Sequence, residues 1–339
     1  MSGDTPTHGT AAETASTDPV LDVSELKTYY PVTGGILQRT VGQVKAVDGV
    51  SFEIGRGETL GLVGESGCGK STLGRTLVRL QEPNGGSVRF KGTDLAELSK
   101  SALRKRRSDI QIIFQDPASS LNPRMTVEKT ITEPMRFLTD WSKEERRSRV
   151  MELIREVGLS EEHLSRAPHE FSGGQQQRIA IARALSVNPT FVVCDEPTSA
   201  LDVSVQADIL NLLQRLQDKY DLTYLFISHD LSVVRHISDR IAVMYLGKFA
   251  EVAPTAELFD DPKHPYTRAL LSSVPRAGPD VMEDRIILEG DVPSPQDPPS
   301  GCRYHTRCQE YIGPICEEAE PEFVEMDDHH TCACHHYSD

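Results

Sequence analysis

The segment at residues 64–72 reads G-E-S-G-C-G-K-S-T and constrains the fold more than any other part of the chain. Its spacing, G-x-x-x-x-G-K-[ST], is typical of loops that hold phosphate groups. The apolar residues 60–63 predict a buried strand before it, and residues 72–80 predict a helix after it. Glycines in such a turn let backbone N–H groups point inward, and the start of the helix adds partial positive charge. The segment therefore predicts an anion-binding loop.

Two side chains of this loop have chemistry suited to a magnesium nucleotide. Lys70 would reach the β- and γ-phosphates, and the Ser71 hydroxyl would bind Mg²⁺. Because one motif of this length also arises by chance, other motifs have to agree with it. The other residues that we expect to contact the nucleotide here are Gly64, Ser66, Gly67, Cys68, Gly69 and Thr72.

Length and charge limit the classes of function. With 339 residues, the chain is long enough for one large domain or two ordinary ones. The net charge is −15, from 36 Lys and Arg against 51 Asp and Glu, which argues against general nucleic-acid binding because that needs a basic face. No apolar run approaches the ~18 residues that span a bilayer, and the start lacks the pattern of a signal peptide. We therefore expect a soluble chain, or one that partner proteins hold at a membrane.

Strand and helix patterns alternate along the chain, which predicts an α/β fold with a parallel sheet. Residues 1–19 have almost nothing to bury, so we expect a disordered tail there, and short strands are expected between residues 20 and 58. A Pro/Asn/Ser loop is predicted at residues 116–127. Further buried strands are predicted at 110–114, 191–194, 225–228 and 241–245, and helices at 142–157, where S-K-E-E forms a capping box, and at 172–186.

Polar residues follow three of the predicted strands. Gln115, the pair Asp195–Glu196, and His229 each come at a strand end, and S-G-G-Q at 172–175 opens a predicted helix. Ligands of parallel sheets bind at these carboxyl ends. After the phosphate loop the four features follow in the chain order Gln115, S-G-G-Q, Asp195–Glu196 and His229. In this order they resemble the nucleotide-binding subunit of ATP-binding-cassette (ABC) transporters over about residues 20–251.

The resemblance implies a fold and its division into domains. The fold would be α/β, a P-loop NTPase (RecA-like) core with antiparallel β and α-helical subdomains, followed by a small, irregular, Cys-rich C-terminal extension. We expect the ABC nucleotide-binding domain at 20–254, its helical subdomain at about 116–185, and the extension at 255–339. A soluble ABC ATPase acting on DNA or ribosomes is the alternative from a different class, and the single cassette and the acidic charge disfavour it.

The resemblance also assigns roles at the strand ends. Asp195 would hold Mg²⁺ through water, with Ser71 and Gln115 as further metal contacts. Glu196 would be the general base that orients or deprotonates the attacking water, and His229 would contact the γ-phosphate. The implied cofactors are therefore ATP and Mg²⁺, and the implied reaction is ATP hydrolysis with Glu196, His229 and Gln115 as catalytic residues.

A further implication of the resemblance is that one chain cannot complete an ATP site. The S-G-G-Q segment would be the signature that serves the γ-phosphate bound by a second subunit, so two ATP molecules would lie between two subunits. Tyr30 would stack on the adenine, with the neighbouring Tyr29 as a competitor. The signature residues are Ser172, Gly173, Gly174 and Gln175.

Several segments resemble the ATPase subunits of dipeptide and oligopeptide importers in particular. They are Q-D-P-A-S-S-L-N-P-R at 115–124, H-P-Y-T-R-A-L-L at 264–271, G-D-V-P-S-P at 290–295 and G-C-R-Y-H-T-R-C at 301–308. The resemblance implies an F-type subunit at the cytoplasmic face of the membrane, paired with a similar D-type ATPase, two transmembrane permeases and an extracytoplasmic peptide-binding protein. Nickel or another small solute is the alternative to a peptide substrate, and no nucleic-acid partner is expected.

Five of the seven cysteines crowd the last part of the chain, from residue 302 onward. Because a cytosolic chain keeps its thiols reduced, this crowd favours a metal site over disulfides. No C-x2-C pair is present, so four thiolates on irregular loops favour an iron–sulfur cluster over an ordinary zinc ribbon. Zinc with nearby histidines, or no metal, are the alternatives. The resemblance implies a 4Fe–4S cluster on Cys302, Cys308, Cys316 and Cys334, with Cys334 preferred to Cys332.

Overall fold

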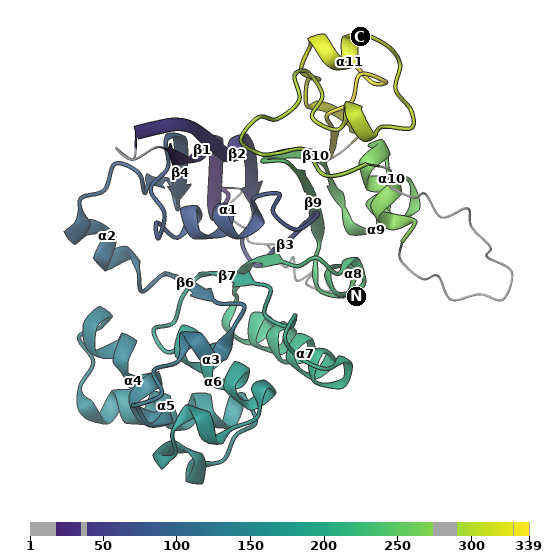
Figure 1. The fold of residues 1–339 in the computed structure, drawn as a ribbon. Coiled ribbons are helices and arrows are strands. Elements are labelled where there is room, and N and C mark those ends of the chain that lie inside the picture. The colour runs from purple at the N-terminus through teal and green to yellow at the C-terminus, as the bar shows by residue number, and fades with distance from the viewer. Residues whose placement is uncertain (1–17, 35–38, 274–289, 328, 339) are drawn as a thin grey trace, which may run out of the picture.

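The computed structural model of the chain describes residues 18–34, 39–273, 290–327 and 329–338. Almost all of the predicted tail at residues 1–19 lies outside these ranges. Within them, a small antiparallel sheet and a larger mixed sheet carry helices, and a C-terminal extension lies at one end of the molecule (Figure 1). The expected α/β class is therefore confirmed. None of the helices in these ranges is long and apolar enough to cross a membrane.

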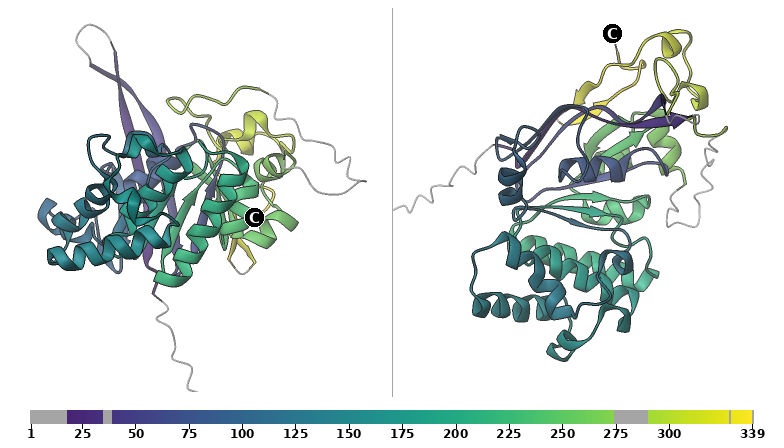
Figure 2. Two further views of the ribbon diagram at one scale, coloured as in Figure 1. Left: turned by 90° about the horizontal axis from the view of Figure 1, so that it is seen from below. Right: turned by 60° about the vertical axis from the view of Figure 1, so that its left-hand side comes forward.

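The first sheet is antiparallel, with the strand order β2-β1-β4-β5. The prediction of short strands between residues 20 and 58 is wrong, because β1 and β2 have 14 and 16 residues. Register shifts along their pairing let such long strands bend and twist. The far ends of these two strands project from the body as a hairpin (Figure 2). The strands are β1 (Leu21–Gly34), β2 (Arg39–Ile54), β4 (Gly85–Phe90) and β5 (Thr93–Asp94).

The second sheet has the order β11-β12-β10-β9-β3-β8-β7-β6, where β11 is Val324–Asp327 and β12 is His330–Cys332. Four of the predicted buried strands, β9, β3, β8 and β7, lie inside it, whereas the predicted strand at 110–114 is β6, which lies at the edge and is buried only at its two ends. Strands β6, β7, β8, β3 and β9 run parallel, and β10 pairs antiparallel with β9. Every residue of β3, β7 and β8 is buried, as parallel strands covered on both faces require. The bounds are β3 (Thr59–Val63), β6 (Ile110–Ile113), β7 (Phe191–Asp195), β8 (Thr223–Ile227), β9 (Arg240–Tyr245) and β10 (Lys248–Pro254).

Helix α1 (Lys70–Leu77) follows the phosphate loop and lies between the two sheets (Figure 1). Its Leu73 and Leu77 are fully buried in the hydrophobic cluster that joins the sheets. The helix ends before the predicted limit at Leu80, because Arg79 adopts a left-handed backbone with φ of 54°. Burial of α1 fixes the loop in front of it against both sheets.

Helices α4 to α8 pack into a second hydrophobic cluster on the far side of the core sheet. Helices α3 to α6 form a group beyond β6 and β7 (Figure 1). The predicted capping box is confirmed: Ser142 N–H donates to Glu145 at 2.6 Å, and Glu145 N–H donates to the Ser142 hydroxyl at 3.1 Å. The bounds are α2 (Lys100–Arg106), α3 (Pro117–Ser120), α4 (Val127–Leu138), α5 (Lys143–Glu156), α6 (Gly173–Leu185), α7 (Val203–Tyr220) and α8 (Leu231–Ile237), with 3₁₀ turns η1 (Glu161–Ser165) and η2 (Pro168–Glu170).

The C-terminal extension is irregular only in part. Residues 291–300 contain no helix or strand, as their prolines predict. The hairpin β11–β12, however, continues the core sheet, with Glu251 of β10 paired to Cys332 and Val252 to Thr331. Local sequence could not reveal this pairing because the partner strands lie far apart in the chain. The elements are α9 (Thr255–Asp260), α10 (Pro265–Leu271), η3 (His305–Arg307), α11 (Ile315–Glu318), β11 (Val324–Asp327) and β12 (His330–Cys332).

Candidate functional site

The phosphate loop runs from the end of β3 into α1, as the motif predicts. Two of its glycines are required by close backbone contacts. A Cβ on Gly64, whose φ is +152°, would lie 2.1 Å from the Met244 carbonyl oxygen. A Cβ on Gly69, whose φ is +112°, would lie 1.9 Å from the Ala46 carbonyl oxygen. The loop is therefore pressed against β9 and β2, and only glycine fits at these two positions.

Lys70 lies inside the curve of this loop, and only 5% of it is exposed. Its ammonium donates to the Gly64 carbonyl at 2.7 Å and to the Glu65 carbonyl at 3.0 Å. The Cys68 side chain is buried beside it, with Sγ 3.7 Å from the ammonium. Cys68 can therefore contact a bound anion only through its backbone. Ser66 and Gly67 are exposed at the rim. The loop thus brings one buried cation and several backbone N–H groups together.

Ser71 and Asp195 form an oxygen pair suited to Mg²⁺. The Ser71 hydroxyl donates to Asp195 Oδ1 at 2.8 Å, and Arg75 Nη2 lies 3.7 Å from Oδ2. Asp195 ends β7 and is 1% exposed. Burial raises the pKa of its carboxyl, against the hydrogen bond from Ser71. A hydroxyl and a carboxylate at this spacing fit the oxygen ligands that Mg²⁺ prefers, and a bound cation would compensate for the buried charge.

Three side chains from neighbouring strand ends converge beside this pair. Glu196 Oε2 accepts a hydrogen bond from Gln115 Nε2 at 3.0 Å and lies 3.1 Å from His229 Nδ1. Gln115 follows β6, Glu196 follows β7, and His229 follows β8. The parallel order β8-β7-β6 is what places the three ends side by side. The predicted catalytic residues are therefore together, although they are 33 or more positions apart in sequence.

The backbone at Glu196 has a geometry that sequence does not reveal. Its φ is +47°, in the left-handed region, which is uncommon for a residue with a side chain. Glu196 N–H donates to the Ile227 carbonyl of β8 at 3.0 Å, and the Ser199 hydroxyl donates to the Glu196 carbonyl at 3.1 Å. These bonds hold the turn and direct the carboxylate toward Gln115 and His229.

The residues of the predicted signature lie at the start of α6, away from the chain's own phosphate loop (Figure 1). Ser172 and Gln175 form a capping box, with Ser172 N–H donating to Gln175 Oε1 at 3.1 Å and Gln175 N–H to the Ser172 hydroxyl at 3.4 Å. A Cβ on Gly174 would lie 2.5 Å from Val205 of α7, so this glycine allows close helix packing. Gly173 is exposed beside it. The fold therefore presents this helix start to the outside.

Tyr29 and Tyr30 are neighbours on β1 and point to opposite faces of the strand. The Tyr29 hydroxyl donates to Asp48, and burial together with this bond raises the pKa of Tyr29 to about 12. Tyr30 pairs with Val44 of β2 and is half-buried. Because the Tyr29 hydroxyl is bonded to Asp48, Tyr30 stays the preferred candidate for stacking on adenine. This role remains a prediction.

All seven cysteines are free. Four of them line one small cavity of about 20 Å³ in the extension, whereas Cys332 is buried on β12 opposite Glu251. Burial raises the pKa of the Cys302 thiol to about 11, and the nearby thiols act in the same direction. In the described parts of the chain, however, no three His, Cys, Asp or Glu side chains have the arrangement of a metal site. The four cavity cysteines are the predicted Cys302, Cys308, Cys316 and Cys334.

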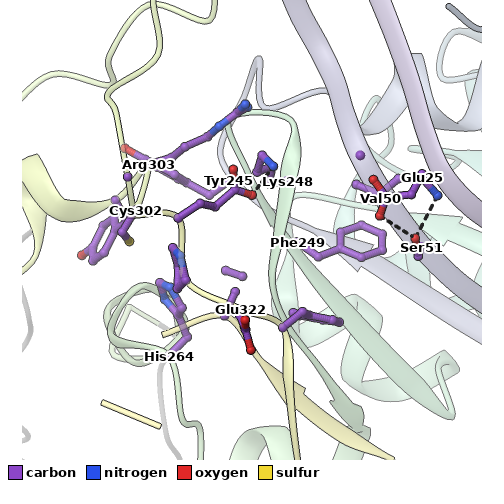
Figure 3. A pocket seen from close by; sticks show the side chains of 18 residues that line it. Glu25, Val50, Ser51, Tyr245, Lys248, Phe249, His264, Cys302, Arg303 and Glu322 are labelled. Atoms are coloured by element: carbon purple, nitrogen blue, oxygen red, sulfur yellow. Dashed lines mark hydrogen bonds and ion pairs between the residues drawn. The ribbon is translucent and has the colours of Figure 1, made fainter. Parts of the chain in front are cut away.

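Two arginines of the extension that sequence analysis passed over reach into the nucleotide-binding part. Arg303 bonds Asp48 and the Leu246 carbonyl, and Arg307 bonds Glu65 of the phosphate loop. A cavity of about 420 Å³ lies where the extension meets β10 and β2 (Figure 3). No sequence signal could have found these contacts, since an arginine between two cysteines predicts no particular partner.

Comparison with known proteins agrees with this arrangement. The family model described as ABC transporter matches residues 47–199, and the model described as oligopeptide/dipeptide transporter, C-terminal region, matches residues 250–316. The oligopeptide transport ATP-binding protein AppF of Bacillus subtilis is 55% identical over 327 residues, which is 96% of this chain and 99% of that protein. The dipeptide transport ATP-binding protein DppF of Escherichia coli is 50% identical over 304 residues, which is 90% of each.

Solved structures show the same core. A dimeric ATP-binding cassette in a post-hydrolysis state bound to ADP and Pi is 30% identical, with a TM-score of 0.62, and covers 69% of this chain and 98% of that one. CbiO1 of Clostridium perfringens, part of an ABC transporter complex, is 28% identical, with the same TM-score of 0.62, and covers 72% of this chain and 92% of that one. By fold, by motif order and by similarity over nearly its whole length, the chain belongs to the family of ATP-binding subunits of oligopeptide and dipeptide ABC transporters.

Proposed function

We propose that the chain binds and hydrolyses ATP to power the import of dipeptides and oligopeptides through an ABC transporter. The observation that carries this proposal is the convergence of Gln115, Glu196 and His229 beside the Ser71–Asp195 pair. The names of the relatives support the peptide class. Nickel or another small solute is the second candidate, since the site that reads the solute would lie in other subunits.

The mechanism follows from the chain's own side chains. Lys70 and the loop N–H groups would bind the phosphates, and Ser71 and Asp195 would hold Mg²⁺, which supplies charge neutralisation of the phosphates. Glu196 would accept a proton from the attacking water or orient it. Its Oε2 is already oriented by Gln115 and His229, both within 3.1 Å, so the base would meet the water in a fixed position.

We infer that two such subunits act together. The exposed start of α6 at Ser172 supports a role toward the ATP of another subunit, and a solved relative is described as dimeric. The partner would be a similar D-type ATPase, giving a heterodimer. Its two sites would bind ATP between the subunits, and closure followed by hydrolysis would switch the permeases between their conformations.

Membrane permeases and a substrate-binding protein are implied for a peptide ABC importer, and the chain would sit peripherally at the cytoplasmic face. A groove of about 670 Å³ beside α4 and α5 supports a docking place for a permease loop. It is lined by Phe137, whose exposed fraction is 60%, and by basic residues such as Arg136 and Arg146. Met125 joins this groove to the 116–127 loop, where we expect the contact.

A more specific part of the proposal concerns the small cavity of the extension that four cysteines line. We propose that Cys302, Cys308, Cys316 and Cys334 hold a 4Fe–4S cluster, with zinc as the alternative. Four free thiols line one cavity, which supports this proposal. Because the described side chains do not have the arrangement of a metal site, the four sulfur atoms would have to move closer together on binding the cluster. Protein purified without oxygen should contain iron and acid-labile sulfide and absorb broadly in the visible range. Zinc alone would favour the alternative, and neither metal would refute both.

The test of the whole proposal is uptake of labelled dipeptides and oligopeptides by cells that lack this chain. We expect uptake to be lost on deletion, restored by the wild-type chain, and not restored by Glu196→Gln. The control is Glu156→Gln, which removes a partly exposed helical carboxylate paired with Lys219 and should restore uptake fully. Normal peptide uptake after deletion would contradict the peptide class, and the same strains tested for labelled nickel would then decide between the two candidates.

A further inference from the structure

Arg307 of the extension makes a two-pronged contact with the phosphate loop. Its Nη1 lies 2.7 Å from Glu65 Oε2, and its Nη2 lies 3.1 Å from Glu65 Oε1. The Arg307 side chain is 5% exposed and the Glu65 side chain 22%, so the pair is largely withdrawn from solvent. The Tyr245 hydroxyl of β9 lies 3.4 Å from the same guanidinium. Paired bonds of this kind fix direction as well as distance.

Tyr266 of α10 holds the same loop residue through its backbone. The Glu65 N–H donates to the Tyr266 hydroxyl at 2.9 Å, and Tyr266 is fully buried. Its ring packs against Tyr245 at 4.7 Å and against Tyr304 at 5.3 Å between centroids. Because Tyr304 belongs to the same segment as Arg307, both contacts to Glu65 come from one packed aromatic cluster.

Glu65 connects these contacts to the lysine of the loop. Its carbonyl oxygen accepts from the Lys70 ammonium at 3.0 Å, while its N–H and carboxylate are held by Tyr266 and Arg307. Every polar group of Glu65 is therefore engaged, two by the extension and one by Lys70. A shift of Glu65 would move the carbonyl that orients Lys70 and the first turn of the loop.

We propose that Arg307 and Tyr266 are positioning residues, through which the C-terminal extension holds the phosphate loop in the conformation that binds nucleotide. The inference rests on the proposed role of residues 64–72 in binding phosphates. It assigns the extension a direct part in nucleotide affinity, separate from any metal on its cysteines. Neither residue is expected to touch the nucleotide.

The experiment measures the dissociation constants of MgATP and MgADP for the purified transporter that contains the full chain, by titration with a fluorescent nucleotide analogue and competition. For Arg307→Met we expect about tenfold weaker binding of both nucleotides, because apparent affinity falls in proportion to the fraction of loops in the competent conformation. Arg307→Lys keeps the charge but not the two-pronged contact, and should fall between Arg307→Met and wild type. Tyr266→Phe removes only the hydroxyl and should weaken binding about threefold.

The matched control is Arg268→Met. Arg268 also bonds a carboxylate of the extension, Glu310, at 2.7 and 2.9 Å, and its other hydrogen bonds go to Pro262 and Tyr337 rather than to the phosphate loop. We expect its nucleotide affinity to equal that of wild type, although its melting temperature falls. A purely structural role for Arg307 would lower the melting temperature in the same way and leave affinity in the folded protein unchanged. Equal weakening by Arg268→Met would therefore overturn the proposal.

Lys70→Ala separates this inference from the proposed function. If Lys70→Ala loses nucleotide binding while Arg307→Lys and Tyr266→Phe bind like wild type, the inference fails and the phosphate-loop assignment stands. If Lys70→Ala binds normally, the assignment itself fails. Should Arg307→Met not fold, Arg307→Lys and Tyr266→Phe decide the question, because each keeps most of the buried volume.

Discussion

The nucleotide-binding core and the C-terminal extension place their functional side chains by different means. In the core, Gln115, Glu196 and His229 stand at the ends of adjacent parallel strands, whose backbone ladder fixes their spacing. In the extension, side chains do the positioning: Arg307 holds Glu65, and Arg303 holds Asp48. Few of the residues between 290 and 318 belong to a helix or strand.

These two ways of positioning side chains predict different effects of substitutions on function and on stability. A site built on strand ends can lose a side chain and keep its frame, because backbone hydrogen bonds carry the frame. A segment held by buried charged and aromatic contacts is destabilised whenever one of these contacts is removed. Substitutions in the core site should therefore change chemistry more than stability. Substitutions of buried contacts in the extension that do not reach the phosphate loop should change stability more than chemistry.

The largest effect is expected from Glu196→Gln, at the core site. Hydrolysis should fall by roughly 10²- to 10⁴-fold, because an amide cannot accept the proton of water as the carboxylate does. Binding of MgATP and the melting temperature should stay near wild type, since Gln keeps the shape and a hydrogen-bond acceptor. Steady-state phosphate release and nucleotide titration on the same preparation measure both. Turnover at the wild-type rate would remove Glu196 from the role of base.

The next largest effect is expected at Glu251, whose carboxylate joins β10 to the extension through hydrogen bonds. This carboxylate is fully buried on β10 and accepts from Lys263 N–H at 2.7 Å, from His264 N–H at 2.9 Å and from His330 Nε2 at 2.8 Å. Glu251→Gln should cost about 3 kcal/mol of unfolding free energy, because one of these buried partners loses its charged acceptor. Urea unfolding gives the value, and hydrolysis by the folded protein should change little.

The control for this joint is Glu257→Gln. Glu257 of α9 lies 3.8 Å from His330 Nδ1, but its side chain is 51% exposed. Its loss should cost less than about 0.5 kcal/mol. Equal costs for the two substitutions would mean that burial at Glu251 does not stabilise the joint.

A smaller, acid-dependent effect follows from the same carboxylate. Burial alone would raise the pKa of Glu251, but the hydrogen bonds from His330 and from the Lys263 and His264 backbone hold it below its ordinary 4.5. A lowered folded pKa means that Glu251 stabilises the fold above the unfolded pKa and stops doing so as the pH falls through the folded pKa. The stability gap between wild type and Glu251→Gln should therefore shrink below about pH 4.5. A gap unchanged down to about pH 3 would contradict the assignment.

The smallest effect is expected from the N-terminal cap of α5, which stabilises the chain through local structure alone. Ser142→Ala removes half of the capping box of α5 and should cost about 1 kcal/mol. Ser148, an exposed residue inside the same helix, is the control, and Ser148→Ala should be neutral or slightly stabilising because alanine favours helix. Thermal unfolding of the pair measures the difference. Equal behaviour would show that the cap adds nothing in the folded chain.

Sequence alone determined most of the core site, because its signals are local. The phosphate loop needs glycine where the backbone is left-handed and crowded, as at Gly64 and Gly69, and a capping box needs serine and glutamate three positions apart. The buried strands are short apolar runs, and the polar residues after them are read directly from the chain. Once the fold is a parallel sheet, these residues must gather at one edge.

Tertiary structure alone decided the rest, because the partners are distant in sequence. The length of β1 and β2 depends on their pairing, and β11–β12 is a hairpin because β10 offers an edge. The bond between Arg307 and Glu65 spans 242 positions, and no local pattern selects one carboxylate among many for an arginine. Such contacts arise only when the folded core sets two segments side by side and excludes water from between them.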